Sequence, residues 1–267
     1  MEHLKLAVDA ERAIGTIVLD RSDCANAIND QTVNEISEAY RSLDADERVK
    51  VIVLSGAGKG FCSGHQLGGS PTGQPLTALE DVEILLRQNN RLLDIYNGNT
   101  PMIAKVHGYC LGAAVELVLL CDLSIASADS RFAHPAIRGA GGSPNALLYP
   151  FALGFSKAKE YLWVTPELSG TEAAEWQLVN RAVPAGELDA WANKWASRIA
   201  SMPVENIRIM RRGLRRLQDM AGYREASEIG ADLDAFGHSG PATKQWKDTV
   251  AEVGLKEAVR RRDSAFL

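Results

Sequence analysis

Hydrophobic and polar residues alternate along the first two-thirds of the chain with the period of a strand and then with that of a helix. Apolar, β-branched runs predict strands at Ile14–Leu19, Val49–Leu54, Met102–Val106 and Leu123–Ala126. Apolar residues at three- and four-residue spacing predict helices over 30–44, over 77–97 and over Val115–Leu120. Strands that alternate with helices through short connections indicate parallel βαβ units, and therefore an α/β fold.

Polar and small residues mark the ends of these elements. Thr77 and Glu80 have the spacing of a capping box, which predicts the start of the second helix. Gly98 and Pro101 predict its end. The stretch 68–75 is rich in Gly and Pro and is expected to form a surface loop.

The pattern changes near residue 186, after which only helical periodicity is found. Breaks at Pro203, Gly222 and Gly240-Pro241 separate helices predicted over 186–201, 203–220, 222–237 and 241–263. These helices have no evident core of their own, so we expect them to pack on the α/β part or on another subunit. We therefore divide the chain into an α/β core at 1–195 and a helical region at 196–267.

Composition narrows the function classes. The chain has 267 residues, 46% hydrophobic and 24% charged, which is ordinary for a globular protein. Its net charge of −5 argues against nucleic-acid binding, and the arginine runs at 211–216 and 260–262 are expected to be solvated helix faces. The longest apolar stretch is interrupted by Glu116 and Asp122, so no membrane span is predicted. The four cysteines show no C-x-x-C spacing, which fits a reducing compartment, and we expect a cytoplasmic protein.

Two turns at the carboxyl ends of predicted strands are poor in side chains. One spans 58–67 and the other spans 107–116. In α/β folds such turns are where ligands bind, and small residues let a ligand approach backbone N–H groups. Two N–H groups aimed at one oxygen would form an oxyanion hole.

Glu116 is the one carboxylate within these turns. It follows Ala113 by three residues and has apolar neighbours, so its pKa is expected to be raised toward the range of a general acid or base. A purely structural glutamate is an equally acceptable interpretation. Cys62 is better explained as a packed small side chain than as a nucleophile. The chain lacks the G-x-S-x-G motif of α/β serine hydrolases, and no G-x-G-x-x-G motif of Rossmann dehydrogenases follows the first predicted strand, so both classes are disfavoured. No cluster of His, Cys and carboxylate residues has metal-ligand spacing, so we expect no metal.

Five stretches together resemble the crotonase (enoyl-CoA hydratase/isomerase) superfamily. They are PMIAKVHGYCLGAAVELVLLCDLSIA at 101–126, RSDCANAI at 21–28, GKGFCSGHQL at 58–67, LSGTEAAEWQLVNRAV at 168–183 and GLKEAVRRRD at 254–263. The resemblance covers nearly the whole chain in the family's order. It implies a crotonase-like ββα spiral core with a C-terminal helical block, and an acyl-CoA substrate that reacts through a thioester enolate.

The resemblance also implies roles for single residues. The backbone N–H groups of His65 and Ala113 would form the oxyanion hole, and Glu116 falls on the first of the two catalytic glutamates of the hydratases. Residues that would line the coenzyme A channel are Ala25, Ala27, Ser63 and Leu67. The family's C-terminal helices imply a homotrimer or a hexamer. No cofactor is implied beyond the coenzyme A of the substrate.

The chain departs from the family at the second glutamate of the hydratases. The family pattern F-x-x-P-E appears here as Phe132-Ala-His-Pro135-Ala136, and the segment that follows is shorter than in the family. Losing one of two acid/base groups costs roughly 10²–10⁴ in rate, which counts against simple hydration. His134 is a candidate substitute acid or base, although a histidine that only holds the loop is favoured. Two alternatives stay open: a thioester hydrolase or C–C bond-cleaving branch, and an acyl-CoA-binding homologue without chemistry.

Overall fold

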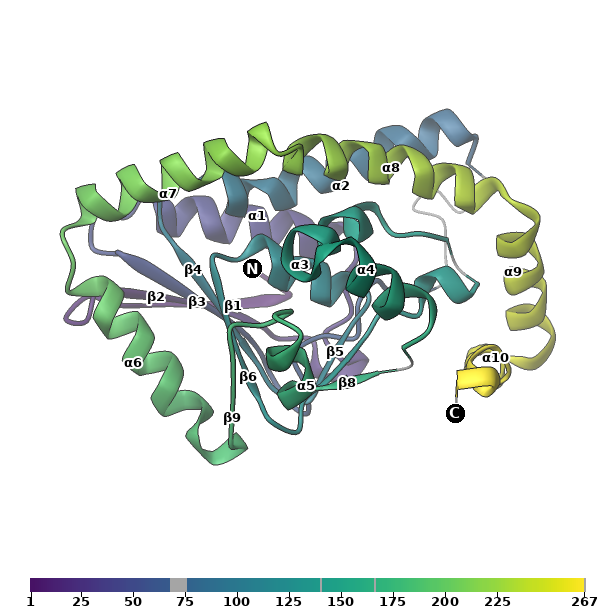
Figure 1. Ribbon diagram of the computed structural model, residues 1–267, viewed down its shortest axis with the longest axis horizontal. Coiled ribbons are helices and arrows are strands. Elements are labelled where there is room, and N and C mark those ends of the chain that lie inside the picture. Colours follow the sequence, from purple (N-terminus) through teal and green to yellow (C-terminus); the bar gives the residue numbers. More distant parts are fainter. Residues whose placement is uncertain (68–75, 140, 166, 267) are drawn as a thin grey trace.

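A six-stranded sheet forms the centre of the molecule (Figure 1). The computed structural model describes residues 1–67, 76–139, 141–165 and 167–266. In spatial order the strands are β1 (Leu4–Asp9), β2 (Ile14–Leu19), β3 (Val51–Gly56), β4 (Met102–Val106), β6 (Leu123–Ser127) and β9 (Arg181–Val183). Among the described strands of this six-stranded sheet, β1 and β2 pair antiparallel and the other neighbours pair parallel. A smaller sheet contains β5 (Tyr109–Leu111), β7 (Arg131–Ala133) and β8 (Leu168–Ser169).

Helices connect and cover these strands. They are α1 (Asp30–Asp44), α2 (Ala78–Asn97), α3 (Ala113–Leu120), α4 (Tyr149–Trp163), α5 (Gly170–Glu175), α6 (Leu188–Ala200), α7 (Val204–Met220), α8 (Tyr223–Ser239), α9 (Pro241–Val253) and α10 (Leu255–Asp263). The predicted capping box at Thr77 and Glu80 is confirmed, since both of its reciprocal hydrogen bonds are present. The single helix predicted over 241–263 is wrong. Gly254 adopts φ 77° and ψ 157°, which ends α9 and starts α10.

All four predicted strands are confirmed, and β3 begins two residues later than expected. Five strands were missed. β1 buries only Leu4 fully and so has no clear alternation of apolar and polar positions, while β5, β7, β8 and β9 are two or three residues long. The loop predicted over 68–75 lies outside the described residues.

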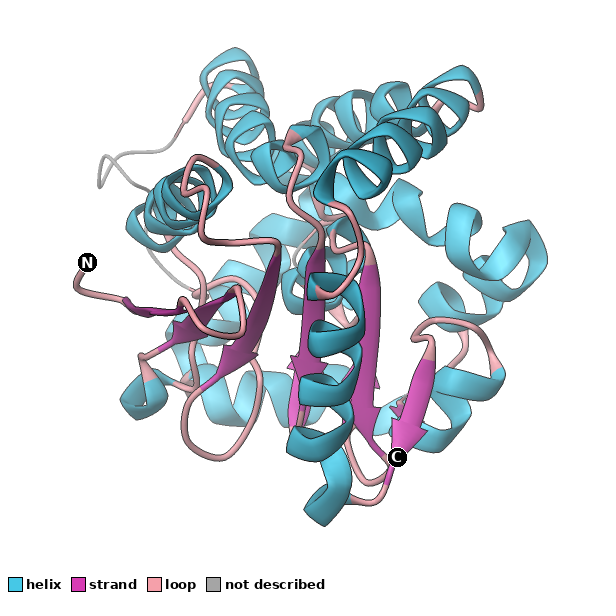
Figure 2. Ribbon diagram, turned by 90° about the vertical axis from the view of Figure 1, so that its left-hand side faces the viewer, coloured by secondary structure: helices cyan, strands magenta, loops and turns pink. Residues whose placement is uncertain are grey.

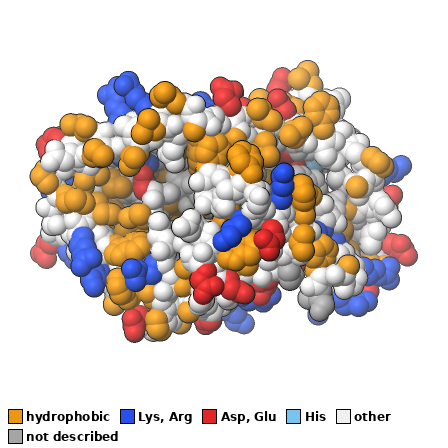
Figure 3. Space-filling model, in the orientation of Figure 1, with side chains coloured by type: hydrophobic (Ala, Val, Ile, Leu, Met, Phe, Trp, Pro, Cys, Tyr) orange, Lys and Arg blue, Asp and Glu red, His pale blue; other side chains and the backbone are white. Residues whose placement is uncertain are grey.

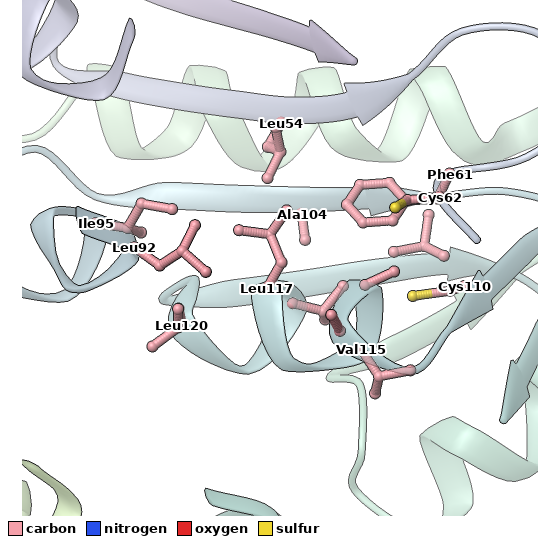
Figure 4. Packing of buried hydrophobic residues seen from close by; sticks show 14 of the residues in the cluster. Leu54, Phe61, Cys62, Leu92, Ile95, Ala104, Cys110, Val115, Leu117 and Leu120 are labelled. Atoms are coloured by element: carbon pink, nitrogen blue, oxygen red, sulfur yellow. The ribbon is translucent and has the colours of Figure 1, made fainter. Parts of the chain in front are cut away.

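The parallel strands are buried on both faces, which explains their continuous apolar runs. On β3, Val51 and Val53 join a cluster under α6 with Ala192 and Ala196. Figure 2 shows a helix on this side, running in front of the strands. Ile52 and Leu54 point to the opposite face and join the main core. In Figure 4, α2 supplies Leu92 and Ile95 to this core, and α3 supplies Val115, Leu117 and Leu120.

The C-terminal helices pack back on the α/β part. α8 lies along α2, as Figure 1 shows, and α6 packs against one face of the six-stranded sheet. The predicted boundary between 195 and 196 therefore falls inside α6, whose Ala192 and Ala196 share one cluster. Among the described residues, no helix combines the length and apolar character needed to cross a bilayer.

The first arginine run is only partly a solvated helix face: Arg212 and Arg216 are exposed as predicted, whereas Arg211 and Arg215 contact the rest of the chain. Arg211 is 8% exposed, pairs with Asp122 at 2.7 Å and donates hydrogen bonds to the carbonyl groups of Ile95 and Gly98. Arg215 also donates to carbonyl groups at this end of α2, among them that of Tyr96. The two arginines thus cap the unpaired carbonyl groups at the end of α2. In the second run, Arg260 and Arg261 do lie on an exposed face, where both pair with Glu257.

Candidate active site

The N-terminus of α3 lies next to the turn that follows β5. Gly112 adopts φ 54° and ψ −122°, a conformation that lets the chain pass from strand to helix without an intervening loop. The backbone N–H groups in the first turn of a helix have no partner inside that helix. Ala113 is the first residue of α3, so its N–H group has no acceptor within that helix.

The turn after β3 is fastened against this helix end. The side-chain amide of Asn26 donates to the carbonyl groups of Ala57, Gly60 and Phe61. Gly64 has φ 88°, and a Cβ atom there would lie 2.4 Å from the Leu111 carbonyl oxygen and 3.3 Å from the Ala113 nitrogen. Only glycine allows this approach, which brings His65 beside Ala113.

The turn that carries one predicted donor, His65, therefore packs against the start of α3, which carries the other, Ala113. Within the described part of the chain, neither the His65 nor the Ala113 backbone N–H group donates a hydrogen bond to another protein atom. Both remain available for a ligand oxygen at the positive end of the α3 dipole.

Glu116 lies one turn along α3, is 2% exposed and has both carboxylate oxygens engaged. His134 Nε2 is 2.9 Å from Oε1, and the Asn145 backbone N–H donates to Oε2 at 3.2 Å. A buried carboxylate that accepts two hydrogen bonds has a fixed orientation, which suits a group that must meet a substrate atom.

The expected raised pKa of Glu116 is wrong. Burial raises this pKa, but the hydrogen bond and electrostatic attraction of His134, helped by Ser143 and His65, outweigh burial and hold it below the ordinary glutamate value. The prediction considered only the apolar neighbours of Glu116 in sequence. The carboxylate is therefore ionised at neutral pH, the form required of a base.

His134 is part of this site. Its ring is 1% exposed, packs edge-on against Tyr149 with centroids 5.4 Å apart, and bonds directly to Glu116. Ala136 starts a short 3-10 turn and offers no polar side chain. The side chain that is hydrogen-bonded to Glu116 is therefore the imidazole of His134.

The residues predicted for the coenzyme A channel flank the same turn. The Ser63 N–H donates to the Ala25 carbonyl at 3.0 Å, and Ala25 adopts a left-handed φ of 58°. Ala27 is buried, whereas Leu67 is 45% exposed. The four residues lie together beside His65, between the interior and the surface.

Sequence reasoning missed Ser143 and Asn145. Both follow the Gly141-Gly142 pair, which is a local signal of a turn, and the hydrogen bond from the Asn145 N–H to Glu116 depends on where the fold places this turn. Cys62 is a packed side chain as predicted: it is buried, its thiol donates to the Asn26 carbonyl, and burial raises its pKa to about 12. No group of three or more metal-ligating side chains comes together in the parts of the chain that the structure describes.

Comparisons with known proteins agree with this geometry. Residues 9–250 match the family model described as Enoyl-CoA hydratase/isomerase. A probable mitochondrial enoyl-CoA hydratase of Dictyostelium discoideum is 32% identical, over 70% of this chain and 67% of that protein. A mevalonyl-coenzyme A hydratase of Aspergillus fumigatus is 30% identical, over 81% and 80%. A crystal structure of an enoyl-CoA hydratase from Mycobacterium smegmatis superposes with a TM-score of 0.92 at 28% identity, over 99% of this chain and 94% of that one.

Proposed function

Because the chain belongs to the enoyl-CoA hydratase/isomerase family, we propose that it converts an acyl-CoA thioester through an enolate intermediate. In this proposal Glu116 moves the proton, and the backbone N–H groups of His65 and Ala113 hold the enolate oxygen. The observation that supports it is a buried carboxylate held by two hydrogen bonds, one helical turn from the place where Gly64 packs against the Ala113 nitrogen.

The two N–H groups supply the larger part of the catalysis. A thioester oxygen gains negative charge as the enolate forms, and each preorganised donor stabilises that charge by about 3–4 kcal/mol. The α3 N-terminus adds its positive dipole end at the same place. Glu116 is held by His134 and Asn145, so it does not need to reorient when the substrate binds.

The reaction we propose is the addition of water to an enoyl-CoA, as in the hydratases to which the chain is similar. Ionised Glu116 takes a proton from water while the water oxygen bonds to the β-carbon, and the double-bond electrons move to the thioester oxygen. The resulting carboxylic acid then gives its proton to the α-carbon and the carbonyl group re-forms. The same carboxylate takes up the proton in the first step and releases it in the second, so the reaction needs no carboxylate at position 136.

The coenzyme A part of the substrate would lie along Ala25, Ala27, Ser63 and Leu67, which flank the turn that carries His65. No resident cofactor is part of the proposal.

We further propose that the protein assembles as a homotrimer, or as a hexamer of two trimers. α7 buries Arg211 against its own chain and leaves apolar side chains uncovered, which is the reverse of an ordinary amphipathic helix. The exposed apolar side chains of α7 and α8 are Ile209, Met210, Leu214, Leu217, Met220, Ile229, Leu233 and Phe236. Hydrophobic side chains over these two helices are visible along the upper edge in Figure 3.

Thioester hydrolysis is the second candidate, favoured by Ala136. A hydrolase needs the oxyanion hole and a single base to deliver water to the thioester carbon, and therefore loses less by the missing carboxylate. The two reactions differ in their products, since hydrolysis releases free coenzyme A.

The test is mass spectrometry of the purified protein after incubation with short, long and cyclic enoyl- and acyl-CoA thioesters. We expect a product heavier by one water from an enoyl-CoA, and its loss in Glu116→Gln. Glu11→Gln, a change at an exposed glutamate, should leave turnover intact. Free coenzyme A would move the assignment to hydrolysis. Binding without product from any thioester, or unchanged turnover in Glu116→Gln, would overturn the proposed chemistry.

A further inference from the structure

A strained serine lies at the point where the shortened loop returns to the site. Ser143 has φ 81° and ψ 132°, in the left-handed half of the Ramachandran plot where side chains other than glycine are disfavoured. It lies just before the 3-10 turn Pro144–Leu148. Backbone strain of this kind persists where surrounding contacts enforce it, and it clusters at functional sites.

The Ser143 hydroxyl is buried without a protein partner. The residue is 9% exposed, and among the described residues its Oγ has no hydrogen-bond partner at an ordinary distance and angle. The hydroxyl nevertheless lies close enough to the Glu116 carboxylate to lower the pKa of that group. Two residues further on, the Asn145 N–H holds Glu116 Oε2. A buried hydroxyl that faces a carboxylate and has no partner of its own is a group that a ligand can satisfy.

A second acidic residue enforces this conformation from the C-terminal helices. Asp234 of α8 is 3% exposed, and its Oδ1 accepts the backbone N–H groups of Gly142 at 2.8 Å and of Ser143 at 2.9 Å. A Cβ atom on Gly141 would lie 2.7 Å from the same oxygen, so the loop can approach Asp234 only because that position is glycine.

Asp234 is itself held in place by a chain of polar contacts. His238 Nε2 lies 3.5 Å from Asp234 Oδ1, and His238 Nδ1 lies 2.7 Å from Asp81 Oδ2 on α2. The loop that faces Glu116 is therefore fastened to two helices distant from it in sequence. This anchoring of the Gly142 and Ser143 backbone fixes the position of Ser143.

We propose that the Ser143 hydroxyl is the second polar group of the acyl-CoA site, where it binds the reacting water beside Glu116, and that Asp234 positions it. This inference rests on the proposed function. Ser143 either donates one hydrogen bond to the water or accepts one from it. Glu116 takes a proton from the water while the water oxygen bonds to the β-carbon. The hydroxyl keeps its own proton, because a serine hydroxyl does not ionise near neutral pH; its contribution is to orient the water that a carboxylate at position 136 would otherwise share.

The proposal is tested by steady-state kinetics on the enoyl-CoA that the wild-type protein hydrates best. Ser143→Gly removes the hydroxyl and relieves the left-handed strain, so we expect an unchanged or higher melting temperature. We also expect kcat to fall by about 10- to 100-fold, the value of one hydrogen bond in a charged site, with KM nearly unchanged. Ser130→Ala, at a fully buried serine distant in sequence from Glu116, is the matched control and should alter stability rather than kcat.

The positioning role of Asp234 has a separate readout. Asp234→Ala should lower kcat to a similar extent in the wild-type background and cause little further loss in the Ser143→Gly background, because both changes act through one hydroxyl. Asp234→Asn keeps an acceptor oxygen and should restore most of the activity. Asp232→Asn, at an exposed position of the same helix, serves as the control.

Three outcomes would overturn the proposal in distinguishable ways. Wild-type kcat in Ser143→Gly, while Glu116→Gln is inactive, removes the role of Ser143 and leaves the proposed function standing. Losses that add in the double variant remove the positioning role of Asp234. A wild-type protein that converts no thioester overturns the proposed function and this inference together.

Discussion

Replacing His134 by phenylalanine should raise the pKa of Glu116. The two side chains are buried and joined by one hydrogen bond of 2.9 Å, and a bond to a charged group contributes about 1.5–3 kcal/mol. At 1.36 kcal/mol per pKa unit, its loss corresponds to a rise of roughly 1–2 units. Burial of the carboxylate, then opposed only by Ser143 and His65, acts in the same direction. Phenylalanine keeps a ring to pack against Tyr149.

The assay is the pH dependence of kcat/KM. In the wild-type protein the acidic limb should lie below about pH 4.3, the ordinary pKa of glutamate, because Glu116 acts as the ionised base. In His134→Phe the limb should move to higher pH by roughly 1–2 units. His134→Gln retains an N–H donor and should give an intermediate limb. Tyr149→Phe changes the same pocket without touching either hydrogen bond to Glu116, so its limb should stay in place.

The same change should alter stability with a definite sign. The depressed pKa of Glu116 stabilises the wild-type fold above the unfolded-state pKa, and this contribution is lost as the pH falls through the lower folded-state pKa. In His134→Phe the folded-state pKa is raised, so the ionised carboxylate destabilises the fold as the pH rises through that value. The variant should therefore lose about 1.5–3 kcal/mol at pH 7 and less near pH 4.5. An unshifted acidic limb, or an equal loss of stability at both pH values, would refute this account of the Glu116–His134 pair.

Three further predictions concern the frame of the site. Arg211→Ala leaves Asp122 and the end of α2 without their buried partner, and should cost about 3–5 kcal/mol, or roughly 5–10 °C in melting temperature measured by circular dichroism; an unchanged melting temperature would contradict the capping role. Gly64→Ala should lower kcat about 10²–10³-fold because its Cβ displaces the oxyanion turn, and wild-type kinetics in that variant would show that the turn is not involved. Cys62, whose pKa is raised to about 12, should react with a thiol reagent only after unfolding, whereas partly exposed Cys24 reacts in the native state; rapid native labelling of Cys62 would disprove its burial.

Local sequence signals determined most of the central sheet and its helices. β2 and β4 were predicted with the bounds that the structure gives. A short, mostly apolar run is typical of a parallel strand whose two faces are both buried. The start of α2 was equally local, since Thr77 and Glu80 cap each other within one turn. The shortest strands escaped prediction because two or three residues carry no periodicity.

The order of motifs along the chain also identified the family and indicated Glu116, His65 and Ala113 as candidate site residues. Each of these residues lies in a turn whose small residues and position after a strand are local properties. The sequence therefore indicated which backbone groups are accessible, and the structure adds that the two turns meet at Gly64.

Tertiary structure alone decided the electrostatics of the site and the exposed face of the C-terminal helices. The pKa of Glu116 depends on His134, which is 18 residues away, and its orientation also depends on Asn145, 29 residues away. The Ser143 conformation depends on Asp234, 91 residues further on. α7 turns Arg211 and Arg215 toward α2, because the last carbonyl groups of α2 lack donors within that helix. The periodicity of α7 does not predict this contact. Periodicity and capping are set by neighbours along the chain, whereas a pKa or a buried face is set by whichever groups the fold brings into contact.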